Sequence, residues 1–145
     1  MNTIEIVIEN TQSKRTIEQG TSLSVLAQEY YNELQKENGT SPYPILGALV
    51  NNRVESLEYN IFRPKTIQFF DITHRQGWRI YQNSLCFLLY KATRDIYPQS
   101  QLTICHSMTN GFYCTIRNTE NGQIPDQLEM AQKIRERMHE LQISD

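Results

Sequence analysis

The hydrophobic pattern of the first 36 residues changes its period at Gly20, and this change most constrains the fold. Residues 3–9 read T-I-E-I-V-I-E, an alternation typical of a strand with one buried face, and Lys14–Ile17 continue it after a polar turn. After the turn and N-cap signal Gly20-Thr21-Ser22, apolar residues recur at the spacing of one helical face, at Leu23, Leu26, Ala27, Tyr30, Tyr31 and Leu34. A hairpin followed by one amphipathic helix is therefore predicted.

Two further strands are predicted before residue 73. Ile45–Val50 is a short apolar run that ends at the turn dipeptide Asn51-Asn52, and Thr66–Ile72 is rich in β-branched and aromatic residues. The order hairpin, helix, strand, short linking strand, strand is the order that lays one helix across one sheet in a β-grasp domain. We therefore predict an α+β chain in which residues 1–72 form a β-grasp domain.

The second half is predicted to begin after a hinge at 73–77, a polar segment that ends in glycine. Residues 78–97 have helical periodicity, and Pro98 ends the helix. Its apolar residues share an arc of about 100° and are expected to be buried: Trp78, Tyr81, Leu85, Leu88, Leu89, Ala92 and Ile96.

A second hairpin and a last helix follow. Gln101–His106 and Gly111–Arg117 are predicted strands, with Asn110-Gly111 providing the positive φ of a tight turn. Asp126, with Glu129 three residues later, marks a helix start. The expected buried stripe of this helix is Leu128, Ala131, Ile134, Met138 and Leu141. Because one hairpin and two helices make a thin unit, we expect residues 78–145 to be a domain cut short from a longer protein.

Charge is unevenly distributed along a chain of net charge −2. Residues 1–72 and 118–145 each carry −3, whereas residues 73–117 carry +4. A basic segment of this size can contact phosphates, but the overall charge argues against a protein that coats nucleic acid. The apolar runs are too short to span a bilayer and no secretory signal begins the chain, so we expect a cytoplasmic protein with no membrane partner.

Known catalytic motifs are missing from the sequence. It contains no GxxxxGK[ST] loop, no GxGxxG after a strand, no HExxH and no GxSxG, which are the usual marks of nucleotide, metalloprotease and hydrolase chemistry. Neighbouring residues of a strand face opposite ways, so Cys105 and His106 make poor ligands for one metal, while Cys105 and Cys114 could face each other across the hairpin and give two ligands at best. We therefore predict no metal site, no catalytic residue and no cofactor in this chain.

The best binding candidate is the other side of the helix at 78–97, which carries both guanidinium groups and aromatic rings. Arginines bind phosphate and rings stack on bases. The candidate ligand-binding residues are Arg79, Asn83, Phe87, Tyr90 and Arg94, with His106 and Cys114 added from the hairpin. In the alternative interpretation, Phe87 and Tyr90 pack against the first domain or a missing segment.

Two stretches resemble known families. G-A-L-V-N-N-R, followed by T-I-Q-F-F-D-I, resembles a TGS domain, the β-grasp module of threonyl-tRNA synthetases and certain GTPases and stringent-response enzymes. N-S-L-C-F-L-L, then I-Y-P, T-I and N-G-F-Y, is similar to the start of the threonyl-tRNA synthetase editing domain. The family's H-S-x-x-H-L-L motif carries two histidines of the site that hydrolyses mischarged tRNA, and here their positions hold Asn83 and Phe87. Since neither side chain serves in general acid–base catalysis, the resemblance implies a degenerate editing domain.

The order of a TGS domain followed in sequence by a degenerate editing domain is also similar to the N-terminal region of bacterial uridine-kinase-like nucleoside kinases. That resemblance implies a non-catalytic regulatory or ligand-binding module of an ATP- and Mg²⁺-dependent kinase, whose C-terminal P-loop domain would be its partner and lies outside this chain. The alternative is a threonyl-tRNA synthetase-related editing or tRNA-binding module. In the editing version, Cys114 and His106 would form the altered site that deacylates tRNA. A third hypothesis is that the module only dimerises or docks the kinase domain. The sequence does not determine whether the ligand is a nucleotide or RNA, nor the oligomeric state.

Overall fold

The computed structural model describes residues 2–38, 43–109, 111–118 and 126–143, and these divide into two compact units, 1–81 and 82–145. The boundary falls inside a helix that contributes to both units. Each unit is described by itself below.

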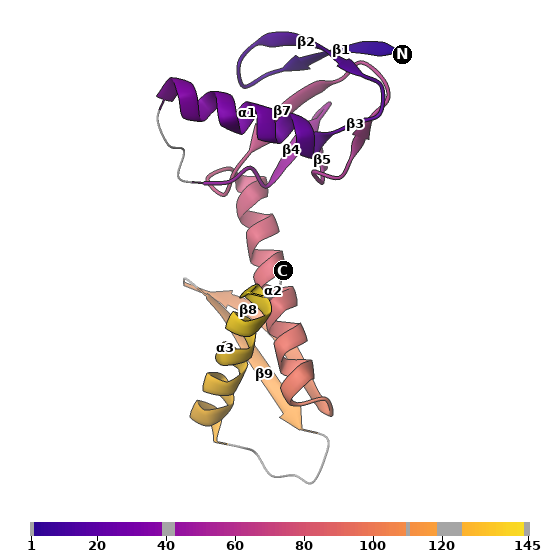
Figure 1. Cartoon of the computed structure of the whole chain (residues 1–145). Helices are drawn as coiled ribbons and strands as arrows, with labels where there is room; N and C mark the ends of the chain where they lie inside the picture. Colours follow the sequence, from indigo (N-terminus) through magenta and orange to yellow (C-terminus); the bar gives the residue numbers. More distant parts are fainter. Residues whose placement is uncertain (1, 39–42, 110, 119–125, 144–145) are drawn as a thin grey trace. The chain divides into compact units, whose positions relative to one another are not determined.

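Unit 1 combines a mixed five-stranded sheet with one helix (Figure 1). Its elements, with the helix shared with unit 2 given last, are β1 (Thr3–Ile8), β2 (Ser13–Glu18), β3 (Thr21–Ser22), α1 (Leu23–Asn38), β4 (Gly47–Val50), β5 (Arg53–Glu55), β6 (Asn60–Ile61), β7 (Thr66–Phe70) and α2 (Arg75–Ile96). The sheet order is β2-β1-β7-β4-β5, in which β1 and β7 are parallel and the other neighbours antiparallel, while β3 and β6 pair separately. This confirms the predicted α+β class.

The core of unit 1 lies between α1 and one face of the sheet. The alternation of β1 places Ile6 and Ile8 in the interior, where they join Ile67 and Phe69 of β7 and the apolar side of α1. Tyr30 of α1 stacks on Phe69 with ring centroids 5.3 Å apart. The predicted turn at Asn51-Asn52 is confirmed, because both residues have positive φ, 47° and 64°, as a two-residue hairpin turn requires.

The side chain of Asn10 extends the sheet beyond the end of β1. Its Nδ2 donates to the carbonyl oxygen of Phe69 at 3.0 Å, and its Oδ1 accepts from the Phe69 N–H at 2.8 Å. One side-chain amide thus replaces a backbone partner for β7.

The start of α2 differs from the prediction. The helix begins at Arg75, inside the segment 73–77 expected to be a hinge, and Gly77 is buried in its first turn. A Cβ at Gly77 would overlap the carbonyl oxygen of Asp71 and lie 2.6 Å from its carbonyl carbon. His74 stacks on Phe70 at 5.2 Å between ring centroids. The glycine therefore permits close approach of helix and preceding backbone instead of ending a segment.

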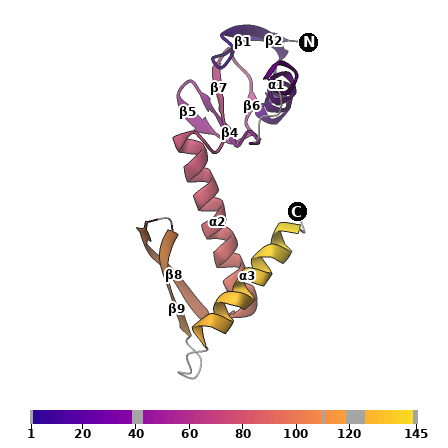
Figure 2. The same cartoon turned by 90° about the vertical axis from the view of Figure 1, so that its left-hand side faces the viewer.

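Unit 2 consists of the C-terminal part of α2, the hairpin β8 (Ser100–Met108) and β9 (Gly111–Asn118), and α3 (Gln127–Ile143). In Figure 2 the hairpin and α3 lie on different sides of α2. Among the described residues of this unit, the side chains buried in its core are few: Ala92, Thr93, Ser100 and Ile134. Asp95 connects the helices, since it accepts from Lys91 Nζ at 2.7 Å and from Arg137 Nη2 at 2.9 Å.

Several predicted buried positions of the two later helices are wrong. Trp78 and Tyr81 are 48% and 40% exposed, and Leu128 and Ala131 are also exposed, whereas Ile134 is buried. The capping prediction is confirmed, because Asp126 Oδ1 accepts from the Leu128 N–H at 3.1 Å. Periodicity identified the apolar side of each helix, but the hairpin and the partner helix cover only part of it.

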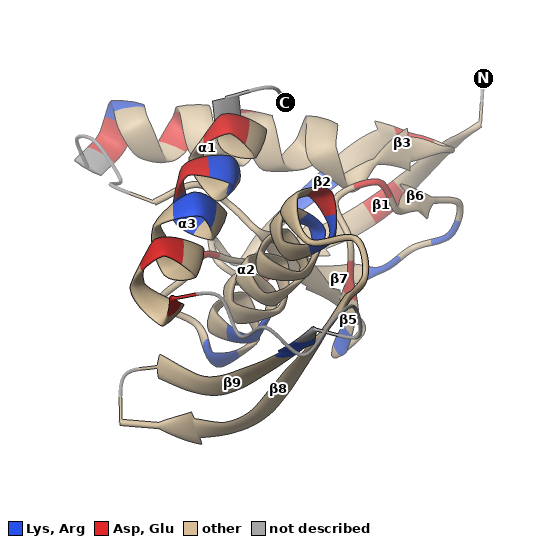
Figure 3. Ribbon diagram, turned by 90° about the horizontal axis from the view of Figure 1, so that it is seen from below, with Lys and Arg blue, Asp and Glu red and all other residues tan. Residues whose placement is uncertain are grey.

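The β8–β9 hairpin has a bulge that the sequence did not predict. Ile104 pairs with Cys114 and His106 with Tyr113, so Cys105 is the extra residue and does not pair with Cys114. The positive φ near the tip, 43°, is at Thr109 and not at Gly111, while Asn110 lies outside the described residues. Both strands are almost free of charge in Figure 3, since residues 98–116 contain no Lys, Arg, Asp or Glu.

Candidate ligand-binding site

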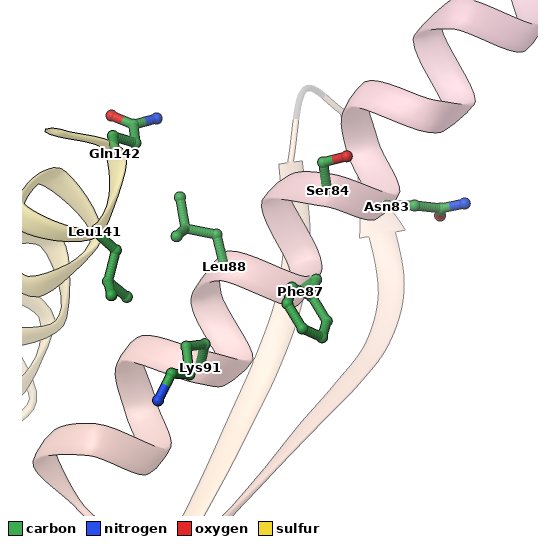
Figure 4. A pocket seen from close by; sticks show the side chains of 7 residues that line it. All are labelled: Asn83, Ser84, Phe87, Leu88, Lys91, Leu141 and Gln142. Carbon is green, nitrogen blue, oxygen red and sulfur yellow. The ribbon is translucent and has the colours of Figure 1, made fainter. Parts of the chain in front are cut away.

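A groove of about 620 Å³ lies in unit 2 on the surface of α2 and α3. Figure 4 shows the residues that line it: Asn83, Ser84, Phe87, Leu88, Lys91, Leu141 and Gln142. The side chains of Leu88 and Leu141 point toward each other from the two helices, and Asn83 and Phe87 lie at the α2 edge. The volume is within the range of small-molecule sites.

Three polar or aromatic side chains follow one ridge of α2. Asn83, Phe87 and Lys91 are spaced by four residues, which brings them onto successive turns of the helix. Phe87 is 73% exposed, the largest exposed fraction of any described aromatic residue. An amide, a ring and an ammonium group are therefore presented in a row to solvent.

The Lys91 ammonium is oriented by a small charge network. Asp95 accepts hydrogen bonds from Lys91 and Arg137, and these two partners hold the pKa of the Asp95 carboxyl below its usual value. Arg137 also contacts Glu140, at 2.9 Å. The network fixes the position of Lys91 at the end of the ridge and ties α2 to α3 beside the groove.

The predicted site residues are only partly brought together. Of the seven, Asn83 and Phe87 line the groove, whereas the others do not: Arg79, Tyr90, Arg94, His106 and Cys114. Arg94 lies with its Cζ 6.0 Å from the centroid of the Tyr90 ring, within cation–π range. His106 stacks on Tyr113 at 5.4 Å between ring centroids.

Sequence reasoning missed five lining residues. Lys91 was detectable, because it follows Phe87 by one helical turn, and Ser84 and Leu88 adjoin predicted residues. Leu141 and Gln142 come from α3, and only the packing of α3 beside α2 places them here.

The groove suits binding more than reaction chemistry. Among the described residues that line it, there is no His, Cys, Asp or Glu, the usual general bases and metal ligands. Cys114, the nucleophile of the editing hypothesis, is half-buried on β9, and burial raises the pKa of its thiol, which disfavours the reactive thiolate. Within the described part of the chain, no group of three or more His, Cys, Asp or Glu residues could hold a metal ion.

The fold and groove together define a two-unit α+β chain with a groove on the surface of unit 2. Known relatives are distant: the chain is 27% identical over 85 residues to a threonine–tRNA ligase of Clostridioides difficile, and 28% identical over 96 residues to that of Clostridium kluyveri. These matches cover 59% and 66% of this chain, but 13% and 14% of the two ligases, and the similarity is to their N-terminal region. No family model matches the chain.

None of the helices among the described residues is both long enough and apolar enough to cross a membrane. The cytoplasmic location stays a prediction.

Proposed function

We propose that this chain is a non-catalytic RNA-binding module related to the N-terminal region of threonyl-tRNA synthetases, and that the α2 groove holds a nucleotide of the RNA. One observation carries the proposal. Asn83 and Phe87, at the positions of the two editing-site histidines in the resembled family, line one groove together with Lys91. In this proposal the place that binds RNA is retained, although the two histidines that act in the editing reaction of the resembled family are replaced by Asn83 and Phe87.

The three side chains of the ridge suit a base face, a base edge and a phosphate of one nucleotide. The exposed Phe87 ring offers a face on which a base can stack, and the Asn83 amide can donate to and accept from a base edge. The Lys91 ammonium can pair with a phosphate while it remains hydrogen-bonded to Asp95. Because Phe87, Asn83 and Lys91 would contact different atoms of the nucleotide, all three could bind it at the same time.

The charge of α2 supports a polyanionic ligand. The helix contains Arg75, Arg79, Lys91 and Arg94 against the single acid Asp95, although the whole chain has a net charge of −2. A locally basic helix on an acidic protein favours phosphate contacts at one place over coating of the whole surface.

The comparisons support tRNA as the RNA. Both ligases are named for action on tRNA, and the chain is similar to their N-terminal region. The helix packed on a mixed sheet in unit 1 is compatible with the TGS β-grasp domain proposed for residues 1–72. The degenerate editing domain at 78–145 remains part of the proposal.

The nucleoside-kinase hypothesis predicts a different ligand. A regulatory module of a uridine kinase would bind a free nucleoside or nucleotide in the same groove, and its ATP, Mg²⁺ and catalytic residues would belong to another domain. No relative found by the comparisons is a kinase, and the threonine–tRNA ligases favour RNA. The kinase therefore stays a prediction that the same titration can test.

The test is a titration of the whole chain with fluorescently labelled tRNA, followed by anisotropy at two salt concentrations. Stacking of one base contributes about 1–3 kcal/mol, so Phe87→Ala should weaken binding roughly 5- to 150-fold. Leu128→Ala is the matched control, because Leu128 is 72% exposed on α3, does not line the groove, and should leave the affinity unchanged.

Two results would contradict the proposal. Accelerated deacylation of mischarged tRNA by the wild-type chain would show that the module is catalytic and would support the editing alternative. Saturable binding of uridine or UTP without any binding of tRNA would instead favour the kinase module.

A further inference from the structure

An exposed aromatic pair lies at the start of α2, outside the groove. The rings of Trp78 and Tyr81 have centroids 5.7 Å apart and an interplanar angle of 32°. The side chains are 48% and 40% exposed, although their positions in the helical pattern predict burial. Two large rings therefore present apolar faces to solvent on unit 1.

The backbone that carries these rings is well anchored. Gly77 lies against the carbonyl of Asp71, and the Trp78 N–H donates to the His74 carbonyl oxygen at 2.9 Å. His74 in turn stacks on Phe70, a buried residue of β7. Because the first turn of α2 is fixed to the sheet, the ring pair is a preorganised surface.

The charges around the pair are positive. Arg75 lies one turn before Trp78 on the same side of the helix, and Arg79 follows it; both are exposed and neither forms an ion pair within the described residues. Residues 72–94 contain no Asp or Glu. The nearest preceding acid, Asp71, accepts hydrogen bonds from the N–H and hydroxyl of Thr73, at 2.8 and 2.5 Å.

We propose that Trp78 and Tyr81 form a second nucleic-acid contact, on which an unpaired base of single-stranded RNA stacks while Arg75 and Arg79 bind the flanking phosphates. This inference rests on the proposed RNA-binding function and adds a site separate from the groove. Charge complementarity selects the ligand, because an apolar protein partner would have to bury two guanidinium groups without acids to pair them. Single-stranded RNA offers free base faces and phosphates together.

The test uses the fact that Trp78 is the only tryptophan of the chain. A single-stranded RNA of about 8 nucleotides is added to the full chain, and tryptophan emission is recorded beside the anisotropy of the labelled RNA. Stacking of a base should quench the Trp78 emission, and the quenching should reach its midpoint at the same RNA-to-protein ratio as the change in anisotropy. Tyr81→Ala should weaken binding at least 5-fold, whereas Tyr81→Phe, which keeps the ring, should restore it.

Two further variants separate the rings from the charges. Arg75→Ala combined with Arg79→Ala should reduce the salt dependence of binding, because fewer counterions are released. Phe62→Ala is the control for loss of an exposed ring, since Phe62 is 57% exposed in the same unit but lies outside α2. It should change neither the affinity nor the quenching.

The outcomes distinguish this inference from the proposed function. If RNA binds and Phe87→Ala weakens it, but Trp78 emission is unchanged and Trp78→Ala binds normally, the function stands and the second contact is refuted. Equal quenching by duplex RNA would refute the requirement for an unpaired base. Quenching of Trp78 together with an RNA affinity that Phe87→Ala leaves unchanged would support the second contact and refute the groove assignment. Absence of all RNA binding would refute both.

Discussion

Replacement of Gly77 by alanine should destabilise unit 1, although the position is helical. At a solvent-exposed position inside a helix this change is favourable by about 1 kcal/mol, because alanine is the better helix former. Here the new Cβ would overlap the carbonyl oxygen of Asp71 and lie 2.6 Å from its carbonyl carbon. The obstacle is backbone, which cannot rotate away as a flexible side chain would.

The magnitude follows from the two opposing effects. Overpacking costs about 1–3 kcal/mol, and a rigid backbone neighbour favours the upper end. After subtraction of the helix preference, the net loss is about 2 kcal/mol. For a domain of this size, about 4–8 °C are lost per kcal/mol, so the melting temperature should fall by roughly 8–16 °C.

Thermal unfolding followed by circular dichroism and by the fluorescence of the adjacent Trp78 measures this loss. Gly111→Ala is the control, because a Cβ at Gly111 meets no atom within 4 Å and should change stability by less than about 0.5 kcal/mol. A Gly77→Ala chain that melts at the wild-type temperature or above it would refute the close approach of α2 to Asp71.

Two other predictions concern the sheet and the helix pair. Asn10→Ala removes both hydrogen bonds to the Phe69 backbone and should lower the free energy of unfolding by about 2 kcal/mol in urea titrations, whereas Gln28→Ala, which removes one exposed hydrogen bond to Asn32, should have little effect. Asp95 has a lowered pKa in the folded chain, so its ion pairs stabilise the fold above the unfolded pKa and are lost as the pH falls through the folded value. The stability advantage of wild type over Asp95→Asn in acid titrations should therefore shrink below about pH 4; an advantage that is constant down to pH 2 would contradict this network.

Local sequence signals were sufficient for most of unit 1. The alternation in β1 and the dipeptide Asn51-Asn52 depend on neighbours in the chain, and the structure has the predicted hairpin, helix and turn. The role of Asn10 could not be predicted, because its partner Phe69 is 59 residues away.

The start of α2 shows the limit of periodicity. The pattern places Trp78 and Tyr81 on the apolar side, but it does not tell whether another element covers that side, and both are exposed. Gly77 was interpreted as the end of a polar segment, since a helical glycine required by close approach of distant backbone has no local signature.

The candidate site was predictable only in part, for a similar reason. Asn83 and Phe87 were identified from their helix face and from the resemblance, and both line the groove. The α3 residues Leu141 and Gln142 were not, because they reach the groove only through the packing of α3 beside α2, and they lie at least 50 positions after Lys91 in the chain.

The position of α2 in both units has a practical consequence for dissecting the protein. The boundary between the units falls after Tyr81, within a continuous helix of 22 residues. A cut there would remove helical hydrogen bonds from both pieces and give each a frayed helix end. Fragments meant to isolate one unit should therefore keep the whole of α2, and a protease that cleaves in loops will find no susceptible peptide bond at this boundary.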